Sequence, residues 1–297
     1  MSEGEPLAAT EAIHPGTRGL DTLTTSALVE TIVADNREAV GAVERATESI
    51  ARAVELIVSR LRTGGSLHYI GAGSSGRLGA LDAAEVPPTF GAPPELVQAH
   101  IAGGVRALTH ALEGVEDDAQ AGEALVNAAV RARDVVVGIS ASGGAPYVVA
   151  AVRRARALGA ATIGLCNDGA APLARVADQV IVLETGAEVL AGSTRLKAGT
   201  AQKLVLNALS TATLVQLGKV YDNLMVDVVA ANEKLRRRAV RLVKLLVPAD
   251  EDRAQTLLDA AAGSVKIAVV MGRRGVDAAQ ARALLDHESG FLRGVIG

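Results

Sequence analysis

Two short loops rich in glycine and serine carry the residues best suited to chemistry. Residues 71–76 read GAGSSG and residues 140–146 read SASGGAP. Each loop follows an apolar run and precedes a helical pattern, and backbone N–H groups at the start of a helix bind anions. The hydroxyls and amides of both loops therefore favour a compact phosphate ester as ligand. Two tight turns that use glycine for positive φ angles are the alternative.

The first loop also matches the dinucleotide fingerprint G-x-G-x-x-G. A dinucleotide site of that kind needs an acidic residue near the end of the next strand, where it binds the ribose hydroxyls. The corresponding stretch here ends in Gln98, His100 and Ile101. Because the acid is missing, the fingerprint alone is a weak signal. A phosphate monoester, bound without a metal ion or a cofactor, is the better prediction.

Two glutamates stand at element boundaries, where they could transfer protons. Glu85 directly precedes Val86-Pro87-Pro88, so we expect a helix to end there and to fix the carboxylate. Glu116 lies in the stretch EGVEDD at another boundary. A general acid at neutral pH needs burial or a like charge while its partner stays ionised, and the apolar VPPTF segment could bury Glu85. Ordinary surface acids or helix N-caps are the alternative, and for Glu116 the sequence pattern alone favours that alternative.

The stretch GSTRLKAGTAQK, residues 192–203, combines hydroxyls with Arg195 and Lys197 just before a long helical pattern. It indicates either an anion contact or an exposed basic helix cap. His68 falls inside an apolar run and is interpreted as a core histidine, and Cys166 as a small buried apolar residue. The histidine spacing fits no metal motif.

Five short apolar runs alternate with helical stretches, at 66–71, 95–101, 134–140, 161–166 and 178–183. This alternation predicts a mostly parallel sheet covered on both faces, that is, a three-layer α/β/α sandwich. Residues 25–62 have the pattern of a helical hairpin, and further helices are expected at 196–217 and 226–246. On its own, the β-branched stretch SVKIAVVMG, residues 264–272, reads as a strand.

The composition argues against several classes of protein. A net charge of −3 gives no general attraction to nucleic acid or anionic lipid, and aromatic residues make up only 2% of the chain. The single cysteine cannot form an intramolecular disulfide. The N-terminus lacks a basic and apolar leader, and no apolar run reaches about 18 residues. We therefore expect no nucleic-acid or membrane partner, and a cytoplasmic location.

The chain resembles the N-acetylmuramic acid 6-phosphate etherases of the sugar isomerase (SIS) family in five ordered motifs: GAGSSGRLGALDAAEVPPTFG, ALEGVEDD, ISASGGAPYV, EVLAGSTRLKAGTAQKLVLNALST and GKVYDNLMVDV. The resemblance implies a homodimer with sites near the subunit interface, and a helix at SVKIAVVMG. It also implies four regions: an N-terminal arm with helices at 1–55, a sugar-phosphate-binding SIS domain at 56–219, a helical linker at 220–248 and a helical subdomain at 249–297.

The resemblance further implies a reaction. The D-lactyl ether at C3 of N-acetylmuramic acid 6-phosphate is cleaved by elimination and water addition, which gives N-acetylglucosamine 6-phosphate and D-lactate. By motif position, Glu85 is the implied proton donor to lactate and Glu116 the implied base at C2. The implied substrate contacts are Gly73, Ser74, Ser75, Ser140, Ser142, Gly143, Ser193 and Lys197.

The chain departs from the family pattern at two places. Gly144 and Ala145 stand where arginine and threonine are usual, which removes one or two hydrogen bonds to phosphate of about 1.5–3 kcal/mol each. His14 precedes Pro15 where asparagine is usual. The altered loop leaves a non-catalytic SIS sensor, similar to the glucokinase regulatory proteins, as an alternative function, beside an aldose–ketose SIS isomerase. Both glutamates are retained, which favours the etherase.

Overall fold

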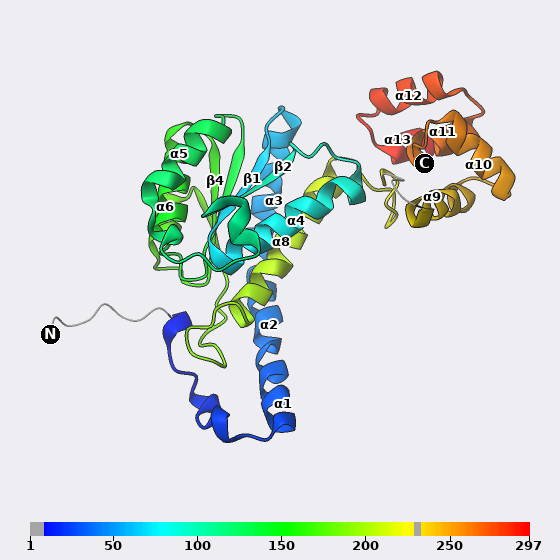
Figure 1. The fold of residues 1–297 in the computed structure, drawn as a ribbon. Coiled ribbons are helices and arrows are strands. Elements are labelled where there is room, and N and C mark those ends of the chain that lie inside the picture. Colours follow the sequence, from blue (N-terminus) through cyan, green and yellow to red (C-terminus); the bar gives the residue numbers. More distant parts are fainter. Residues whose placement is uncertain (1–8, 229–232) are drawn as a thin grey trace. The chain divides into compact units, whose positions relative to one another are not determined.

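The computed structural model describes residues 9–228 and 233–297 (Figure 1). The chain divides into two compact units. The first comprises Met1–Ala83 and Glu95–Ser210, and the second comprises Ala84–Pro94 and Thr211–Gly297. This division does not test the four regions implied by the resemblance, whose boundaries stay predictions.

A five-stranded parallel sheet forms the centre of the first unit. Its strands are β1 (Leu67–Gly71), β2 (Val97–Ile101), β3 (Val135–Ile139), β4 (Ala161–Cys166) and β5 (Gln179–Val182), in the order β2-β1-β3-β4-β5. All residues of β1, β3 and β4 are buried, as expected for strands covered on both faces. The predicted sheet is confirmed.

Helices cover both faces of this sheet. On one face, a side chain at Gly79 of α4 (Gly73–Phe90) would contact Tyr69 and Ile139, which shows how closely that helix approaches β1 and β3. On the other face, α6 (Pro146–Ala157) packs on β3 and β4, with α5 (Ala119–Ala129) beside it and α7 (Pro172–Val176) against β4. The expected three-layer architecture is therefore present.

The helical hairpin expected at 25–62 is instead a succession of three helices, α1 (Thr25–Asp35), α2 (Arg37–Arg45) and α3 (Thr47–Arg62), which follow one another without a reversal of the chain (Figure 1). The joints explain the difference. Asn36 keeps φ −66° and ψ −12°, and Ala46 keeps φ −89° and ψ 1°. Both values stay close to helical geometry, so the chain changes direction too little to fold back. Three 3-10 turns precede α1, at Ala9–Glu11, Pro15–Thr17 and Leu20–Thr22.

The sequence predicts that a helix ends before the double proline. Helix α4 (Gly73–Phe90) instead includes Pro87 and Pro88. The proline ring presets φ near −65°, which a helix accepts, although each proline lacks the N–H that would bond to the carbonyl four residues earlier. The helix ends at Phe90: the next residue, Gly91, has φ +59° and donates its N–H to the Pro87 carbonyl at 2.9 Å.

The second unit is helical. It contains α9 (Glu233–Leu246), α10 (Glu251–Ala260), α11 (Val265–Arg274), α12 (Ala278–His287) and α13 (Leu292–Ile296). The helix expected from residue 226 begins later, since Val226 and Asp227 form a turn and 229–232 lie outside the described residues. The expected helix at 196–217 is α8 (Lys197–Gln216).

The stretch SVKIAVVMG forms α11, so the strand interpretation from β-branching was wrong and the helix implied by the resemblance is confirmed. Ser264 caps its N-terminus by accepting the Ile267 N–H, and Gly275 ends it in the left-handed conformation. Packing on several sides outweighs the strand propensity of β-branched residues, because every residue from Val265 to Val270 is buried. No single described helix is long and apolar enough to cross a membrane; α10 and α11 meet that criterion only as a pair bent by 113°.

Candidate functional site

The order of the strands brings the two glycine and serine loops together. The first loop follows β1 and the second follows β3, and these two strands are neighbours in the sheet. The order reverses between them, since β2 lies on one side of β1 while β3, β4 and β5 follow on the other. In open parallel sheets, ligands bind at such a switch point, outside the carboxyl ends of the strands. This crevice is the candidate site.

The glycines of the first loop allow a close approach of strand and helix. A Cβ atom at Gly71 would lie 2.7 Å from the Gly76 nitrogen, and one at Gly76 would lie 2.6 Å from Cγ1 of Ile101. Gly73 has φ +52° and has no such contact within 4 Å. The first turn of α4 leaves backbone N–H groups without helical acceptors, so the loop presents amides at the crevice.

The two adjacent serines of this loop have different surroundings. Ser74 is half-buried and lines a cavity. Ser75 is buried, and its hydroxyl donates to Oε1 of Gln202 at 2.8 Å. Gln202 in turn donates to Asn167 at 3.3 Å. Ser74 is thus the hydroxyl available to a ligand, whereas Ser75 belongs to an internal network.

The second loop is held by its own hydrogen bonds. Gly143 is buried, and its N–H donates to Oγ of Ser140 at 3.1 Å. The exposed Ser142 accepts the Gly144 N–H at 3.2 Å. Ala145 is the N-cap of α6 and makes no side-chain cap, and the position of a Cβ at Gly144 has only Ser142 Oγ nearby, at 3.7 Å.

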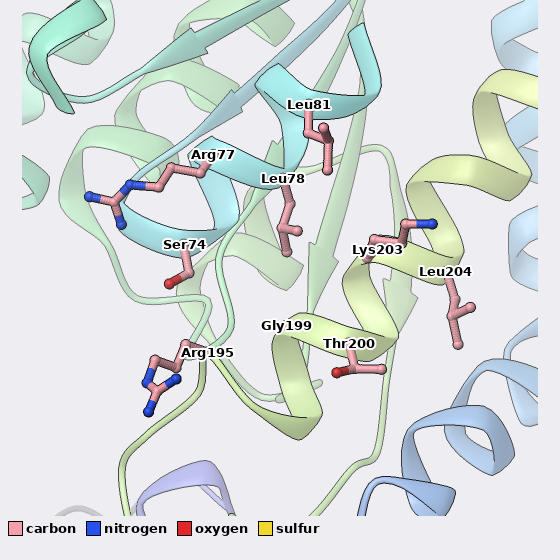
Figure 2. Close-up of a pocket in the computed structure, with 9 residues that line it drawn as sticks. All are labelled: Ser74, Arg77, Leu78, Leu81, Arg195, Gly199, Thr200, Lys203 and Leu204. Atoms are coloured by element: carbon pink, nitrogen blue, oxygen red, sulfur yellow. The ribbon is translucent and has the colours of Figure 1, made fainter. Parts of the chain in front are cut away.

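A cavity of about 490 Å³ lies between α4 and α8 (Figure 2). Ser74, Arg77, Leu78 and Leu81 line it from α4, and Gly199, Thr200, Lys203 and Leu204 line it from α8. Arg195 contributes from the loop that leads into α8. The lining holds three cationic side chains and no carboxylate, so an anionic ligand is favoured.

The cations of this cavity differ in how they are held. The Arg77 guanidinium donates to the carbonyls of Ala107 and His110, each at 2.9 Å. Among the described residues, neither Arg195 nor Lys203 forms an ion pair. Sequence reasoning missed Arg77 and Lys203. Each lies on the same face of its own helix as other residues that line the cavity, because positions three and four apart on a helix lie side by side.

Lys197, implied as a substrate contact, is not among the residues that line the cavity. Its side chain is 3% exposed, and its Nζ is 2.8 Å from Oδ1 of Asp35. The start of α8 is occupied by another internal group: the buried Glu188 carboxylate accepts the N–H groups of Lys197 and Ala198, both at 2.9 Å. A carboxylate there satisfies the helix terminus in place of a ligand anion. Ser193, half-buried nearby, is not among the cavity residues.

The two glutamates lie on different elements. Glu116 is exposed on the 3-10 helix Val115–Asp117 of the first unit, and its neighbour Asp118 caps α5 through the Ala121 N–H. Glu85 is exposed on the part of α4 that belongs to the second unit. The burial expected for Glu85 is not found in the chain. Because the helix continues, Val86 and Phe90 occupy its buried side, and Glu85 lies about 100° or more around the axis from them.

Two other candidates have structural roles. His68 is buried, with Nδ1 at 3.0 Å from Nε2 of His100 and Nε2 at 3.4 Å from Asp134, and burial lowers its pKa. Burial raises the pKa of Cys166 to about 11, which disfavours the thiolate needed in a nucleophile. Among the described residues, no group of three or more His, Cys, Asp or Glu could hold a metal ion.

Comparison with known proteins agrees with this fold. The family model of the glucokinase regulatory protein N-terminal SIS domain matches residues 49–156, and that of the SIS domain matches residues 108–212. The solved structure of E. coli CFT073 c3406 superimposes with a TM-score of 0.50 at 20% identity, over 67% of this chain and 96% of that chain, which concerns the fold alone. The fold and its serine loops thus define a SIS-domain protein.

Curated relatives show to which family of SIS-domain proteins the chain belongs. The N-acetylmuramic acid 6-phosphate etherase of Symbiobacterium thermophilum is 54% identical over 86% of this chain and 86% of its own length. That of Deinococcus radiodurans is 49% identical over 97% of this chain and 95% of its own length. The chain belongs to the N-acetylmuramic acid 6-phosphate etherase family.

Proposed function

We propose that this protein cleaves the D-lactyl ether at C3 of N-acetylmuramic acid 6-phosphate, as a carbon–oxygen lyase that yields N-acetylglucosamine 6-phosphate and D-lactate. One observation carries the proposal: relatives at 54% and 49% identity over most of the chain bear the name of this activity. The sequence motifs that contain Glu85 and Glu116 also resemble those of this family.

The charges of the cavity support a substrate with two anionic groups. N-acetylmuramic acid 6-phosphate carries a phosphate and the carboxylate of its lactyl group. Ser74 and the first turn of α4 offer neutral donors, and Arg77, Arg195 and Lys203 offer positive charge in the same cavity. Hydrogen bonds to charged groups contribute about 1.5–3 kcal/mol each. An uncharged sugar would gain little from this lining.

The proposed chemistry needs one base and one acid. In the ring-opened sugar the aldehyde makes the C2 proton removable, and Glu116 takes it. The C3–O bond then breaks, and Glu85 gives its proton to the departing lactate oxygen. Water adds across the resulting C2–C3 double bond, with hydroxyl at C3 and the proton returned to C2. Both side chains are exposed and accessible to a ligand.

The sharpest test measures D-lactate released from N-acetylmuramic acid 6-phosphate by the pure protein. We expect turnover in the wild type and its loss in Glu85→Ala, while Glu123→Ala, which removes an exposed glutamate of α5, keeps it. Release no faster than in Glu85→Ala would refute the proposal.

A second assay assigns the two roles. In heavy water, deuterium should enter C2 of N-acetylglucosamine 6-phosphate in Glu85→Ala but not in Glu116→Ala. The reverse pattern would mean that the acid and the base are exchanged. Interconversion of an aldose phosphate and a ketose phosphate without lactate release would favour an isomerase.

A SIS sensor is the second candidate, because the glucokinase regulatory protein model matches residues 49–156 and because Gly144 and Ala145 remove usual side chains from the second loop. Binding of the sugar phosphate without turnover would favour it. We further propose a homodimer in the cytoplasm. Sedimentation at two chain masses is the result expected for the dimer, and Cys166 is free, which suits a reducing compartment.

A further inference from the structure

The motif GKVYDNLMVDV, residues 218–228, has no part in the proposed chemistry, yet it is firmly held in the second unit. Tyr221 and Leu224 exchange backbone hydrogen bonds of 3.2 and 2.9 Å. The Tyr221 hydroxyl donates to the carbonyl of Gly297 at 2.6 Å. Val226 and Val228 are buried in the core of that unit. The motif therefore forms a fixed platform.

Asp227 in this motif is held by a buried lysine. Nζ of Lys266, on the first turn of α11, lies 2.8 Å from Oδ2 of Asp227. The same ammonium donates to the carbonyls of Gly218 at 2.7 Å and Gly290 at 2.8 Å. Its three hydrogens thus have three acceptors. Lys266 joins both ends of the motif to α11 and to the turn before α13.

The end of α4 rests directly on Asp227. A Cβ atom at Gly91 would lie 2.3 Å from the backbone oxygen of Asp227, so these two stretches of backbone are in contact. Glu85 lies on α4 six residues before Gly91, about 9 Å away along the helix axis. The contact at Gly91 therefore anchors the helix end that carries Glu85.

We propose that Asp227 and Lys266 are positioning residues for Glu85: their ion pair fixes the backbone against which the end of α4 packs. The inference rests on the proposed function, in which Glu85 protonates the departing lactate. The role of the 218–228 motif is then to hold Glu85 in place, which is separate from proton transfer by the glutamates and from the proposed binding of phosphate by the two loops.

Gly91→Ala tests the contact with lactate release as the readout. The added methyl collides with the Asp227 backbone and displaces the helix end. We expect kcat to fall about 100-fold, as for a misplacement of about 1 Å, with KM within about threefold because the first unit is untouched. Deuterium entry at C2, assigned to Glu116, should persist. Gly275→Ala is the matched control, since Gly275 has φ +69° and no contact of this kind within 4 Å.

Lys266→Met tests the ion pair with hydrogen exchange as the readout. We expect the non-proline amides of 85–92 to exchange about tenfold faster, while those of β1 and β3 are unchanged. If the wild type releases no lactate, the proposed function fails, and the exchange data alone still decide whether the pair holds the helix end. Unchanged exchange in Lys266→Met, or full kcat in a folded Gly91→Ala, would overturn the inference.

Discussion

The Lys197–Asp35 pair allows a direct test of whether Lys197 serves the fold or the substrate. The Asp35 side chain is 9% exposed, and its Oδ2 has no hydrogen-bond partner within residues 9–228 and 233–297. Besides Lys197, His14 approaches Asp35, with its Nε2 at 3.5 Å from Oδ1. Lys197→Met keeps most of the apolar stem and removes only the charge. Asp35 is then left as a buried carboxylate without a full counter-charge.

Loss of one partner of a buried pair costs about 3–5 kcal/mol. We expect about 3 kcal/mol here, at the lower end, because Asp35 retains some contact with water and with His14. The assay is urea unfolding followed by far-ultraviolet circular dichroism, since the chain has no tryptophan. The matched control is Lys244→Met, whose Nζ pairs with Glu251 at 3.2 Å in an exposed position and should cost less than about 1 kcal/mol.

A second variant separates stability from binding. Asp35→Leu combined with Lys197→Met removes both charges and should regain most of the lost stability, because an apolar pair can replace a buried ion pair. In every variant that folds, KM for the sugar phosphate should stay within about threefold of the wild type. A KM raised about tenfold or more, with unchanged urea unfolding, would refute the structural role and make Lys197 a substrate contact.

Three further predictions concern neighbouring groups. Glu188→Gln removes a charge from two hydrogen bonds at the start of α8 and should lower the free energy of unfolding by about 1–3 kcal/mol in urea titrations; an unchanged midpoint would contradict the assigned cap. Ser74→Ala should raise KM several-fold without loss of stability, whereas Ser75→Ala should cost about 1 kcal/mol of stability because it breaks the hydrogen bond to Gln202. Steady-state kinetics and urea unfolding of both variants check this prediction. The opposite pattern would exchange the roles of the two serines. Burial, with a contribution from His68, lowers the pKa of His100 from 6.5 to about 4. The unfolded chain therefore binds more protons below pH 6.5, and stability falls as the pH drops from 6.5 towards 4; His100→Gln should lessen that fall between about pH 7 and pH 5, and an equal fall in both proteins would count against it.

The sheet could be predicted because its signals are local. Each strand is a short run of β-branched or apolar residues between turn residues, and the two serine loops follow β1 and β3 directly. Side-chain partners distant in sequence could not be predicted. Nothing near Lys197 indicates Asp35, which lies 162 positions earlier. Adjacent serines such as Ser74 and Ser75 look alike in the sequence, yet they point about 100° apart on a helix.

The predictions based on prolines and on β-branched residues were wrong for a different reason. Their propensities act on one residue at a time, whereas packing acts on a whole helix. Pro87 and Pro88 lie in the last turn of α4, and the helix includes them although each lacks a backbone N–H. The valines of α11 are buried within a helical core that outweighs their preference for strands. The resemblance, which uses long motifs, gave the helix correctly at α11.

The second loop departs from the family pattern at Gly144 and Ala145. The position of a Cβ at Gly144 is nearly open, and Ala145 already occupies the N-cap position of α6 with φ −52° and ψ 113°, outside the helical range. The Cβ atom of an arginine has space at the first position, and a threonine at the second would add a helix cap as well as a hydroxyl. The backbone of this loop is therefore compatible with the first side-chain atoms of the family's usual residues. Two substitutions, Gly144→Arg and Ala145→Thr, would supply them.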